Sequence, residues 1–390
     1  MGVKLITRTV WVLSMVSLFT DMASEMLYPV MPLFLRSIGF SVVLIGVLEG
    51  MAEATAGLSK GYFGQLSDMS GKRVPFVRIG YSLSAIAKPL LAVSILPLWI
   101  FLARCLDRLG KGIRTGARDA ILSNEASPST KGRVFGFHRS WDTVGAVVGP
   151  AIGLLLIFLF PGDYRFLFVL AIIPGLMAIM LTMMLSESAA VAPTSARRVS
   201  FFSYVGYWKS SSGEHRKVVA GLLCFSLINS SDVFLLLRAR ETGMSDEWVI
   251  GTYIFYNAVY AASSFPAGQI ADRIGLRRAL VIGIALFALV YGAMALGPNS
   301  AQIVIIFLVY GIYAAFNESI GKALITNICP KDEAATAVGT FTSFQSLCAL
   351  FASSAAGWVW LVAGSGVLFG MTALLAAVVC IYFIALPGSR

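Results

Sequence analysis

Long apolar stretches alternate with short polar ones along nearly the whole chain. A stretch of about 20 apolar residues is long enough to cross a bilayer as a helix. The pattern predicts twelve crossing helices, at 9–35, 41–67, 74–93, 96–121, 132–160, 164–186, 217–239, 246–271, 278–296, 301–326, 334–361 and 365–386. Residues 188–216 are rich in Ser, Ala and basic residues and are predicted to form a cytoplasmic linker. The sequence therefore predicts an all-α polytopic membrane protein with six-helix bundles at 1–187 and 217–390.

Composition agrees with a membrane protein. Of the 390 residues, 57% are hydrophobic and only 13% are charged, which leaves too little polar surface for a water-soluble fold. The net charge of +10 does not indicate nucleic-acid binding, because Lys and Arg gather in alternate loops, as membrane topology requires. That distribution predicts that both termini are cytoplasmic. The five cysteines show no metal-binding spacing, and neither a metal nor a cofactor is expected.

The two halves of the chain share one polar motif. The sequence "GQLSDMSGKR" (64–73) returns as "GQIADRIGLRR" (268–278), 204 residues later, between the second and third predicted helices of its half. Because each half has an even number of helices, both copies face the same side of the membrane. Parallel repeats of this kind predict a binding site between the two bundles, near the middle of the bilayer.

This motif resembles the loop between helices 2 and 3 in the major facilitator superfamily of secondary transporters. The resemblance covers almost the whole chain and implies two bundles that rock around a central cavity lined by helices 1, 4, 7 and 10. It also implies that the motif residues gate the cytoplasmic side. The residues are Gly64, Asp68, Gly71, Lys72 and Arg73 in the first copy, and Asp272, Arg277 and Arg278 in the second.

The fifth predicted helix carries a second resemblance. Gly145, Gly149, Pro150 and Gly153 are similar to the helix 5 motif of antiporters in that superfamily. Small residues allow close helix approach, and a proline permits a bend. The resemblance favours export by antiport, and a plain packing seam is the alternative.

Charged residues of the fourth predicted helix share one face. Arg104, Arg108, Lys111 and Thr115 follow each other at steps of four, three and four residues. A charge at the centre of a bilayer costs at least about 2.5–3.5 kcal/mol, so this face should line water or protein. Guanidinium groups suit carboxylates and phosphates, so Arg104, Arg108 and Lys111 are predicted to bind an anionic substrate. An internal network of salt bridges is the alternative, and Asp107 is placed to pair with Arg104 or Lys111.

Acidic residues at membrane depth are candidates for proton coupling. Burial disfavours the charged form of a carboxyl group, so such groups can bind and release protons as access alternates. Asp21 and Glu25 also qualify as substrate-binding residues, and permanent neutralisation of the helix 4 bases is the alternative role. The proton-coupling candidates are Asp21, Glu25, Glu49, Glu53, Asp107, His138 and Asp142.

The second half is poorer in charge. Its polar groups could line an adaptable side of the pocket, or they could hydrogen-bond between helices. The candidate substrate-binding residues there are Asn229, Asp232, Tyr253, Asn257, Asn317 and Glu318.

Together these features predict a proton-coupled secondary transporter. It would export a small anionic or zwitterionic organic solute by antiport, as a monomer in a bacterial cytoplasmic membrane, with protons, solute and lipid as its partners. Uptake by proton symport is the alternative, and divalent-metal transport and a non-transporting sensor are weaker ones. No nucleophile–base constellation and no GxxxxGK[ST] motif is present, so neither an enzyme nor ATP-driven transport is expected.

Overall fold

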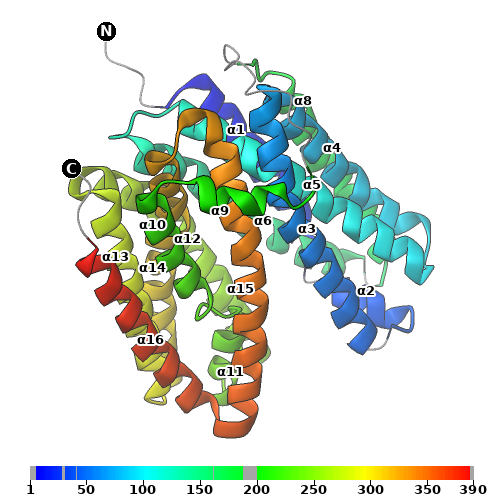
Figure 1. Ribbon diagram of the computed structural model, residues 1–390. Helices are drawn as coiled ribbons and strands as arrows, with labels where there is room; N and C mark the ends of the chain where they lie inside the picture. Colours follow the sequence, from blue (N-terminus) through cyan, green and yellow to red (C-terminus); the bar gives the residue numbers. More distant parts are fainter. Residues whose placement is uncertain (1–5, 29–30, 41, 161, 188–199, 387–390) are drawn as a thin grey trace. The chain divides into compact units, whose positions relative to one another are not determined.

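The computed structural model describes residues 6–28, 31–40, 42–160, 162–187 and 200–386 (Figure 1). These residues form helices joined by short connections, and no strand occurs among them. The helices of the first half are α1 (Arg8–Glu25), α2 (Met31–Ser37), α3 (Val42–Ser70), α4 (Val74–Val93), α5 (Pro97–Asn124), α6 (Lys131–Leu159), α7 (Tyr164–Leu170) and α8 (Ile172–Thr182). Those of the second half are α10 (Gly213–Ser226), α11 (Val233–Glu241), α12 (Asp246–Ile274), α13 (Leu276–Ala295), α14 (Ser300–Ile328), α15 (Ala334–Ala363) and α16 (Ser365–Ala385).

The predicted spans agree with these helices to within a few residues. The helix predicted at 74–93 is α4 itself, and α12 extends three residues beyond the predicted span 246–271. The predicted linker falls partly outside the described residues, and its described end holds the short helix α9 (Tyr207–Ser210). The number of membrane crossings stays a prediction. Within the part of the chain that the structure describes, seven stretches are long and apolar enough to cross a membrane: Val74–Val93, Lys131–Leu159, Tyr164–Thr182, Leu276–Ala295, Ser300–Ile328, Lys331–Ala363 and Ser365–Ala385.

Three of the predicted spans are divided into two helices each. The first span holds α1 and α2, the sixth holds α7 and α8, and the seventh holds α10 and α11. Between α7 and α8 the cause is Pro174, which has no N–H to donate to the helix ladder. Between α10 and α11 the sequence "LINSSD" (227–232) supplies Asn, Ser and Asp side chains that compete with the backbone for hydrogen bonds.

The chain divides into two compact units. Unit 1 contains residues 1–125, 141–210 and 329–343, and unit 2 contains residues 126–140, 211–328 and 344–390. The start of α6 thus belongs to unit 2, and the start of α15 belongs to unit 1. The predicted division into six-helix bundles at 1–187 and 217–390 stays a prediction.

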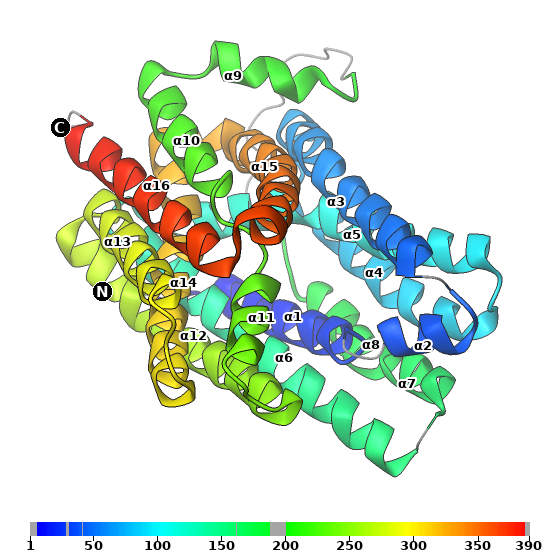
Figure 2. The ribbon, with the colours of Figure 1, turned by 90° about the horizontal axis from the view of Figure 1, so that it is seen from below.

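Close helix contacts organise unit 1. Helix α5 lies between α3 and α4, and α1 packs against α8 (Figures 1 and 2). Gly110 allows the α4–α5 contact, because a Cβ there would lie 2.7 Å from Ser84 Oγ. Gly149 of α6 has the same role toward α1, where a Cβ would lie 2.7 Å from the carbonyl oxygen of Met22.

Aromatic side chains fill the core of unit 2. Helix α14 contacts α12 and α13, and α13 contacts α16. The rings of Phe287 and Tyr291 stack with centroids 4.0 Å apart, and Phe225 meets Phe287 edge to face at 5.0 Å. All three side chains are at most 2% exposed. This core supports α10 on one side of α14.

The repeated motif ends two corresponding helices in the same way. Gly71 follows α3 with φ 64°, and Gly275 follows α12 with φ 97°. A left-handed residue of this kind ends a helix, and glycine adopts that conformation without steric cost. The internal repeat therefore has a structural basis at the backbone.

Candidate functional site

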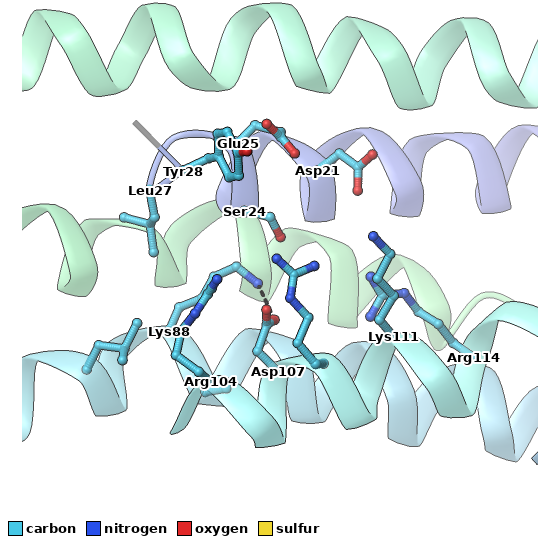
Figure 3. Close-up of a pocket in the computed structure, with 13 residues that line it drawn as sticks. Asp21, Ser24, Glu25, Leu27, Tyr28, Lys88, Arg104, Asp107, Lys111 and Arg114 are labelled. Carbon is cyan, nitrogen blue, oxygen red and sulfur yellow. Dashed lines mark hydrogen bonds and ion pairs between the residues drawn. The ribbon is translucent and has the colours of Figure 1, made fainter. Parts of the chain in front are cut away.

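An ionic cavity lies inside unit 1, among α1, α4 and α5 (Figure 3). Its volume is about 70 Å³, which is room for a charged headgroup or a few water molecules. Five basic and three acidic side chains line it. They are Lys88, Arg104, Arg108, Lys111 and Arg114, with Asp21, Glu25 and Asp107. Arg104, Arg108 and Lys111 of the sequence-predicted stripe line this cavity, and Thr115 does not. The predicted binding site between the two bundles stays a prediction.

One ion pair is fixed at the side of the cavity formed by α4. Lys88 Nζ lies 3.3 Å from Asp107 Oδ1, and it also donates to the carbonyl oxygen of Ser84 at 2.9 Å. The side chains of Lys88 and Asp107 are only 4% and 14% exposed. Asp107 thus pairs with Lys88 of α4, a partner that the sequence did not predict, and its predicted pairing with Arg104 or Lys111 on its own helix stays a prediction. This pair neutralises itself and is structural.

Arg114 is also held by α4. Its Nη1 donates to Ser84 Oγ at 2.6 Å, and its guanidinium lies over the ring of Tyr81, 4.5 Å from the centroid. A hydrogen bond and a cation–π contact together fix the side chain in place. Arg114 therefore closes one end of the cavity as a rigid wall.

The remaining bases face the acids of α1. Asp21 and Ser24 project from α1 toward α5, and Lys111 projects from α5 toward α1 (Figure 3). Arg108 pairs with Glu53 of α3 at 3.1 Å, but the Glu53 side chain is 55% exposed. Arg104 is 9% exposed, whereas Lys111 is exposed and forms no salt bridge with any described residue. The cavity therefore carries more positive than negative charge.

The other predicted proton-coupling residues lie outside this cavity. The Asp142 carboxylate accepts a hydrogen bond from Ser17 of α1, and Asp142 is 5% exposed. His138 is 4% exposed and belongs to the part of α6 assigned to unit 2. The side chain of Glu49 lies outside the described residues. Of the seven candidates, Asp21, Glu25 and Asp107 line the cavity, and Glu53 reaches it through Arg108.

The two copies of the loop motif each bind the first turn of a helix. Asp68 Oδ2 accepts from the backbone N–H of Thr336 at 2.6 Å and from its hydroxyl at 2.8 Å, and Oδ1 lies 3.0 Å from Arg73. Thr336 is in the first turn of α15, where the free N–H groups and the helix dipole attract an anion. Burial raises the pKa of Asp68 to about 6, although Arg73 and Thr336 favour its ionised form.

The second copy repeats this arrangement with a different base. Asp272 accepts from the backbone N–H groups of Gly132 at 2.8 Å and Arg133 at 3.0 Å, in the first turn of α6. Its ion pair is with Arg133 at 3.3 Å. Arg277 instead donates to the carbonyl oxygen of Phe383 at 2.7 Å, at the end of α16. Burial raises the pKa of Asp272.

Comparison with known proteins assigns the family. The family model described as Major Facilitator Superfamily matches residues 13–255 and 239–390, which is nearly the whole chain. The chain belongs to the Major Facilitator Superfamily. It is therefore a membrane transporter and not an enzyme.

Relatives within the superfamily vary in how much is known of them. The chain is 33% identical to an uncharacterized MFS-type transporter of Methanocaldococcus jannaschii, over 91% of this chain and 89% of the relative. It is 21% identical to a multi-drug resistance efflux pump PmrA homolog of Lactococcus lactis, over 80% of this chain and 78% of that protein.

Solved structures from the same superfamily share the fold. The human organic anion transporter MFSD10 aligns with a TM-score of 0.75 at 15% identity, over 96% of this chain and 99% of that one. The transporter FucP aligns with a TM-score of 0.79 at 13% identity, over 99% of this chain and 100% of that one.

The predicted substrate residues of the second half all lie in unit 2 and mostly bond to tyrosines. Asp232 accepts from Tyr310 at 2.6 Å, and the Asn317 amide donates to the Tyr313 hydroxyl at 3.4 Å. The Asn257 amide donates to the carbonyl oxygen of Tyr253 at 3.0 Å, and Glu318 lies 4.0 Å from Arg139. Tyr310 and Tyr313 were missed as candidates, although their i,i+3 spacing places them on one face of the tenth predicted helix.

Proposed function

We propose that this transporter moves a small organic anion, or a zwitterion with an anionic headgroup, and that the proton gradient drives this transport. It would act by alternating access, as a monomer in the cytoplasmic membrane. The observation that carries the proposal is the excess of buried and half-buried bases around the unit 1 cavity, on the helices that superfamily members use to line their substrate path. The loop motifs at Asp68 and Asp272 would gate this movement.

The cavity has the chemistry of an anion site. Arg114 is held by Ser84 and Tyr81 of α4 and forms a fixed positive wall, whereas the charge of Lys88 is neutralised by Asp107. Arg104, Arg108 and Lys111 follow one face of α5 and can direct donors at a carboxylate or phosphate from the same side. A hydrogen bond to a charged group contributes about 1.5–3 kcal/mol, so the loss of one such contact should weaken anion binding measurably.

The acids of α1 suggest how a proton would be coupled to the anion. When Asp21 and Glu25 are ionised, they compensate the bases of α5. When they are protonated, the cavity gains net positive charge, and an anion then binds more favourably. The proton and the anion then each raise the affinity of the cavity for the other, which is the positive linkage that symport requires. Proton–anion symport is therefore the direction of coupling that the geometry supports best.

Export by antiport is the second candidate. A multi-drug efflux pump homolog is among the relatives, and the helix 5 glycines are similar to an antiporter motif. In the structure, however, Gly145, Gly149 and Gly153 all face the backbone of α1, so close packing accounts for them without a role in coupling. The sign of the linkage between proton and anion separates the two candidates.

Proteoliposomes that contain a pH-sensitive dye test the proposal. The panel should hold mono-, di- and tricarboxylates and phosphate monoesters, each added outside at equal pH on both sides. A transported anion is expected to acidify the lumen in symport, because the proton enters with it. A panel in which every anion leaves the luminal pH unchanged, with the gradient in either direction, would contradict the proposal.

The Asp21→Asn variant tests the coupling step. We expect anion counterflow to continue while luminal acidification falls, because the asparagine side chain takes up no proton. Glu214→Gln is the matched control, since Glu214 is an exposed acid in the first turn of α10, outside the cavity. Equal acidification in Asp21→Asn and in Glu214→Gln would remove Asp21 from the coupling role.

A further inference from the structure

Residues 227–232 form a break between α10 and α11 (Figure 1), at the centre of a predicted crossing helix. In a continuous helix, the carbonyl oxygens of Ser226, Leu227 and Asn229 would receive the N–H groups four residues later. Here the N–H of Ser230 bonds to the carbonyl oxygen of Ile228 at 3.1 Å instead. These redirected bonds leave carbonyl oxygens without their helical donors.

Side-chain hydroxyls hold the break open. The N–H of Ser231 donates to Ser353 Oγ of α15 at 3.1 Å, and the N–H of Val233 donates to Ser231 Oγ at 3.4 Å. Among the described residues, no donor reaches the carbonyl oxygens of Ser226, Leu227 or Asn229 outside regular helix bonds. Three carbonyl groups of the break thus receive no hydrogen bond from the described residues, and they lie at the negative end of the α10 dipole.

Two side chains of the break add further acceptors. Asn229 Oδ1 is buried and has no hydrogen-bond partner among the described residues. The Asp232 carboxylate accepts from Tyr310, but no Lys, Arg or His of the described chain lies within salt-bridge distance of it. An uncompensated carboxylate and an orphan amide oxygen at membrane depth are both costly unless a cation joins them.

The surrounding rings limit what kind of cation fits. An organic ammonium would need open aromatic faces, but the face of Tyr310 is stacked on Tyr256 with centroids 4.9 Å apart and is 5.2 Å from Tyr313. A divalent ion would need more carboxylates than the one in the break. A proton would satisfy Asp232 but would leave the amide and the carbonyl oxygens without a partner. A small monovalent metal ion suits one carboxylate together with neutral oxygens.

We propose that the α10–α11 break is a sodium site, formed by the Asp232 carboxylate, Asn229 Oδ1 and the freed carbonyl oxygens of residues 226–229. Tyr310 positions the carboxylate through its hydrogen bond, and Ser353 anchors the break to α15. The site lies entirely in unit 2. It does not depend on anion binding in the unit 1 cavity.

Thermal unfolding of the purified transporter in detergent tests the site without substrate or gradient. Measurements at constant ionic strength compare sodium chloride with choline chloride and potassium chloride. If 100 mM sodium is about a hundredfold above its Kd, the expected rise in Tm is roughly 3 °C over choline. An equal Tm in the three salts would overturn the proposal. A Tm that responds to pH but not to sodium would also overturn it and would identify Asp232 as a proton site.

Variants locate the sodium effect in the break. Asp232→Asn is expected to abolish the sodium-dependent shift, and Asn229→Ala should weaken sodium at least tenfold while the protein stays folded by size exclusion. Glu241→Gln is the matched control, because Glu241 ends the same helix, α11, and pairs with Arg238 away from the break. Retention of the full sodium shift in Asn229→Ala and Asp232→Asn would contradict the assignment.

Discussion

The two units interrupt corresponding helices but surround the interruption with different chemistry. In unit 1 the break follows α1, and the nearby face of α5 carries Arg104, Arg108 and Lys111. At the 204-residue repeat, α14 has Leu308, Ile312 and Ala315 at the equivalent positions. Unit 1 therefore compensates its acids with bases, whereas unit 2 leaves Asp232 among tyrosines. The same fold thus carries a proposed anion-binding cavity in unit 1 and a proposed cation-binding helix break in unit 2.

The largest expected effect is the loss of the buried ion pair in unit 1. Lys88→Met leaves Asp107 without its partner, and removal of one member of a buried pair costs about 3–5 kcal/mol. Thermal unfolding in detergent should show a large fall in Tm, and the double variant Lys88→Met/Asp107→Leu should recover most of it.

The matched variant in unit 2 is Glu318→Gln. It should lower the free energy of unfolding by less than about 1 kcal/mol, because the Glu318–Arg139 pair is long and partly exposed. Equal losses in the two units would contradict the distinction.

A smaller effect is expected at Gly153 of α6, which packs closely against the backbone at the end of α1. The glycine 204 residues later, Gly357 of α15, has no such close contact among the described residues. A Cβ on Gly153 would collide with the carbonyl oxygen of Met26, whereas the repeat-equivalent Gly357 has its nearest neighbour, Phe234 Cζ, at 3.8 Å. Gly153→Ala should cost up to about 3 kcal/mol by overpacking. Gly357→Ala should stabilise α15 or change stability by less than about 1 kcal/mol. The comparison is made by Tm, and a tolerated Gly153→Ala would show that α1 can move away.

The acid of the first loop motif should give unit 1 a pH dependence. Burial raises the pKa of Asp68 to about 6, above its usual value near 4, so the fold favours the protonated form. This stabilisation is complete below pH 4 and is lost as the pH rises through 6, which lowers the free energy of unfolding by about 3 kcal/mol. The Tm of the wild type should therefore fall relative to Asp68→Asn between pH 4 and 7. A Tm difference that is independent of pH would contradict the raised pKa.

The smallest effect is expected for the tyrosine that holds Asp232. Tyr310→Phe removes one hydroxyl donor and keeps the ring stacking, so it should cost about 1 kcal/mol of stability. Tyr313→Phe is the control, since Tyr313 contacts Asn317 at 3.4 Å and not Asp232. If Tyr310→Phe also lowers the sodium-dependent Tm shift and Tyr313→Phe does not, the positioning role of Tyr310 is supported. Identical behaviour of the two variants would remove it.

Hydrophobic periodicity predicted most of the helices. The bounds of α4 and the start of α12 agree with the sequence, because apolar length and the flanking polar residues define a helix locally. The break at 227–232 was missed, because its Asn, Ser and Asp residues are few and lie between two apolar segments. A hydropathy pattern reports the burial of a segment, whereas the break depends on Ser353, which is more than a hundred residues away.

The cavity was predictable only in part. The single-face spacing of Arg104, Arg108 and Lys111 placed them together, and all three line the unit 1 cavity, while their role in substrate binding stays a prediction. The partners of neighbouring charges were not predictable, because Asp107 is paired by Lys88 on another helix. The same holds for Asp272, whose partner Arg133 lies on α6 and not in its own motif. Contacts between helices depend on packing, which spacing within one helix does not encode.

The central claim is that the bases of α5 bind the anion, and an affinity comparison tests it most directly. Anions from the transport panel are titrated into purified wild type, Arg104→Gln and Arg165→Gln, where Arg165 is an exposed base of α7 that serves as the charge-matched control. Loss of a charge-assisted contact of about 1.5–3 kcal/mol predicts roughly 10- to 100-fold weaker binding for Arg104→Gln and no change for Arg165→Gln. Equal affinity of all three proteins for every anion that binds would contradict the account.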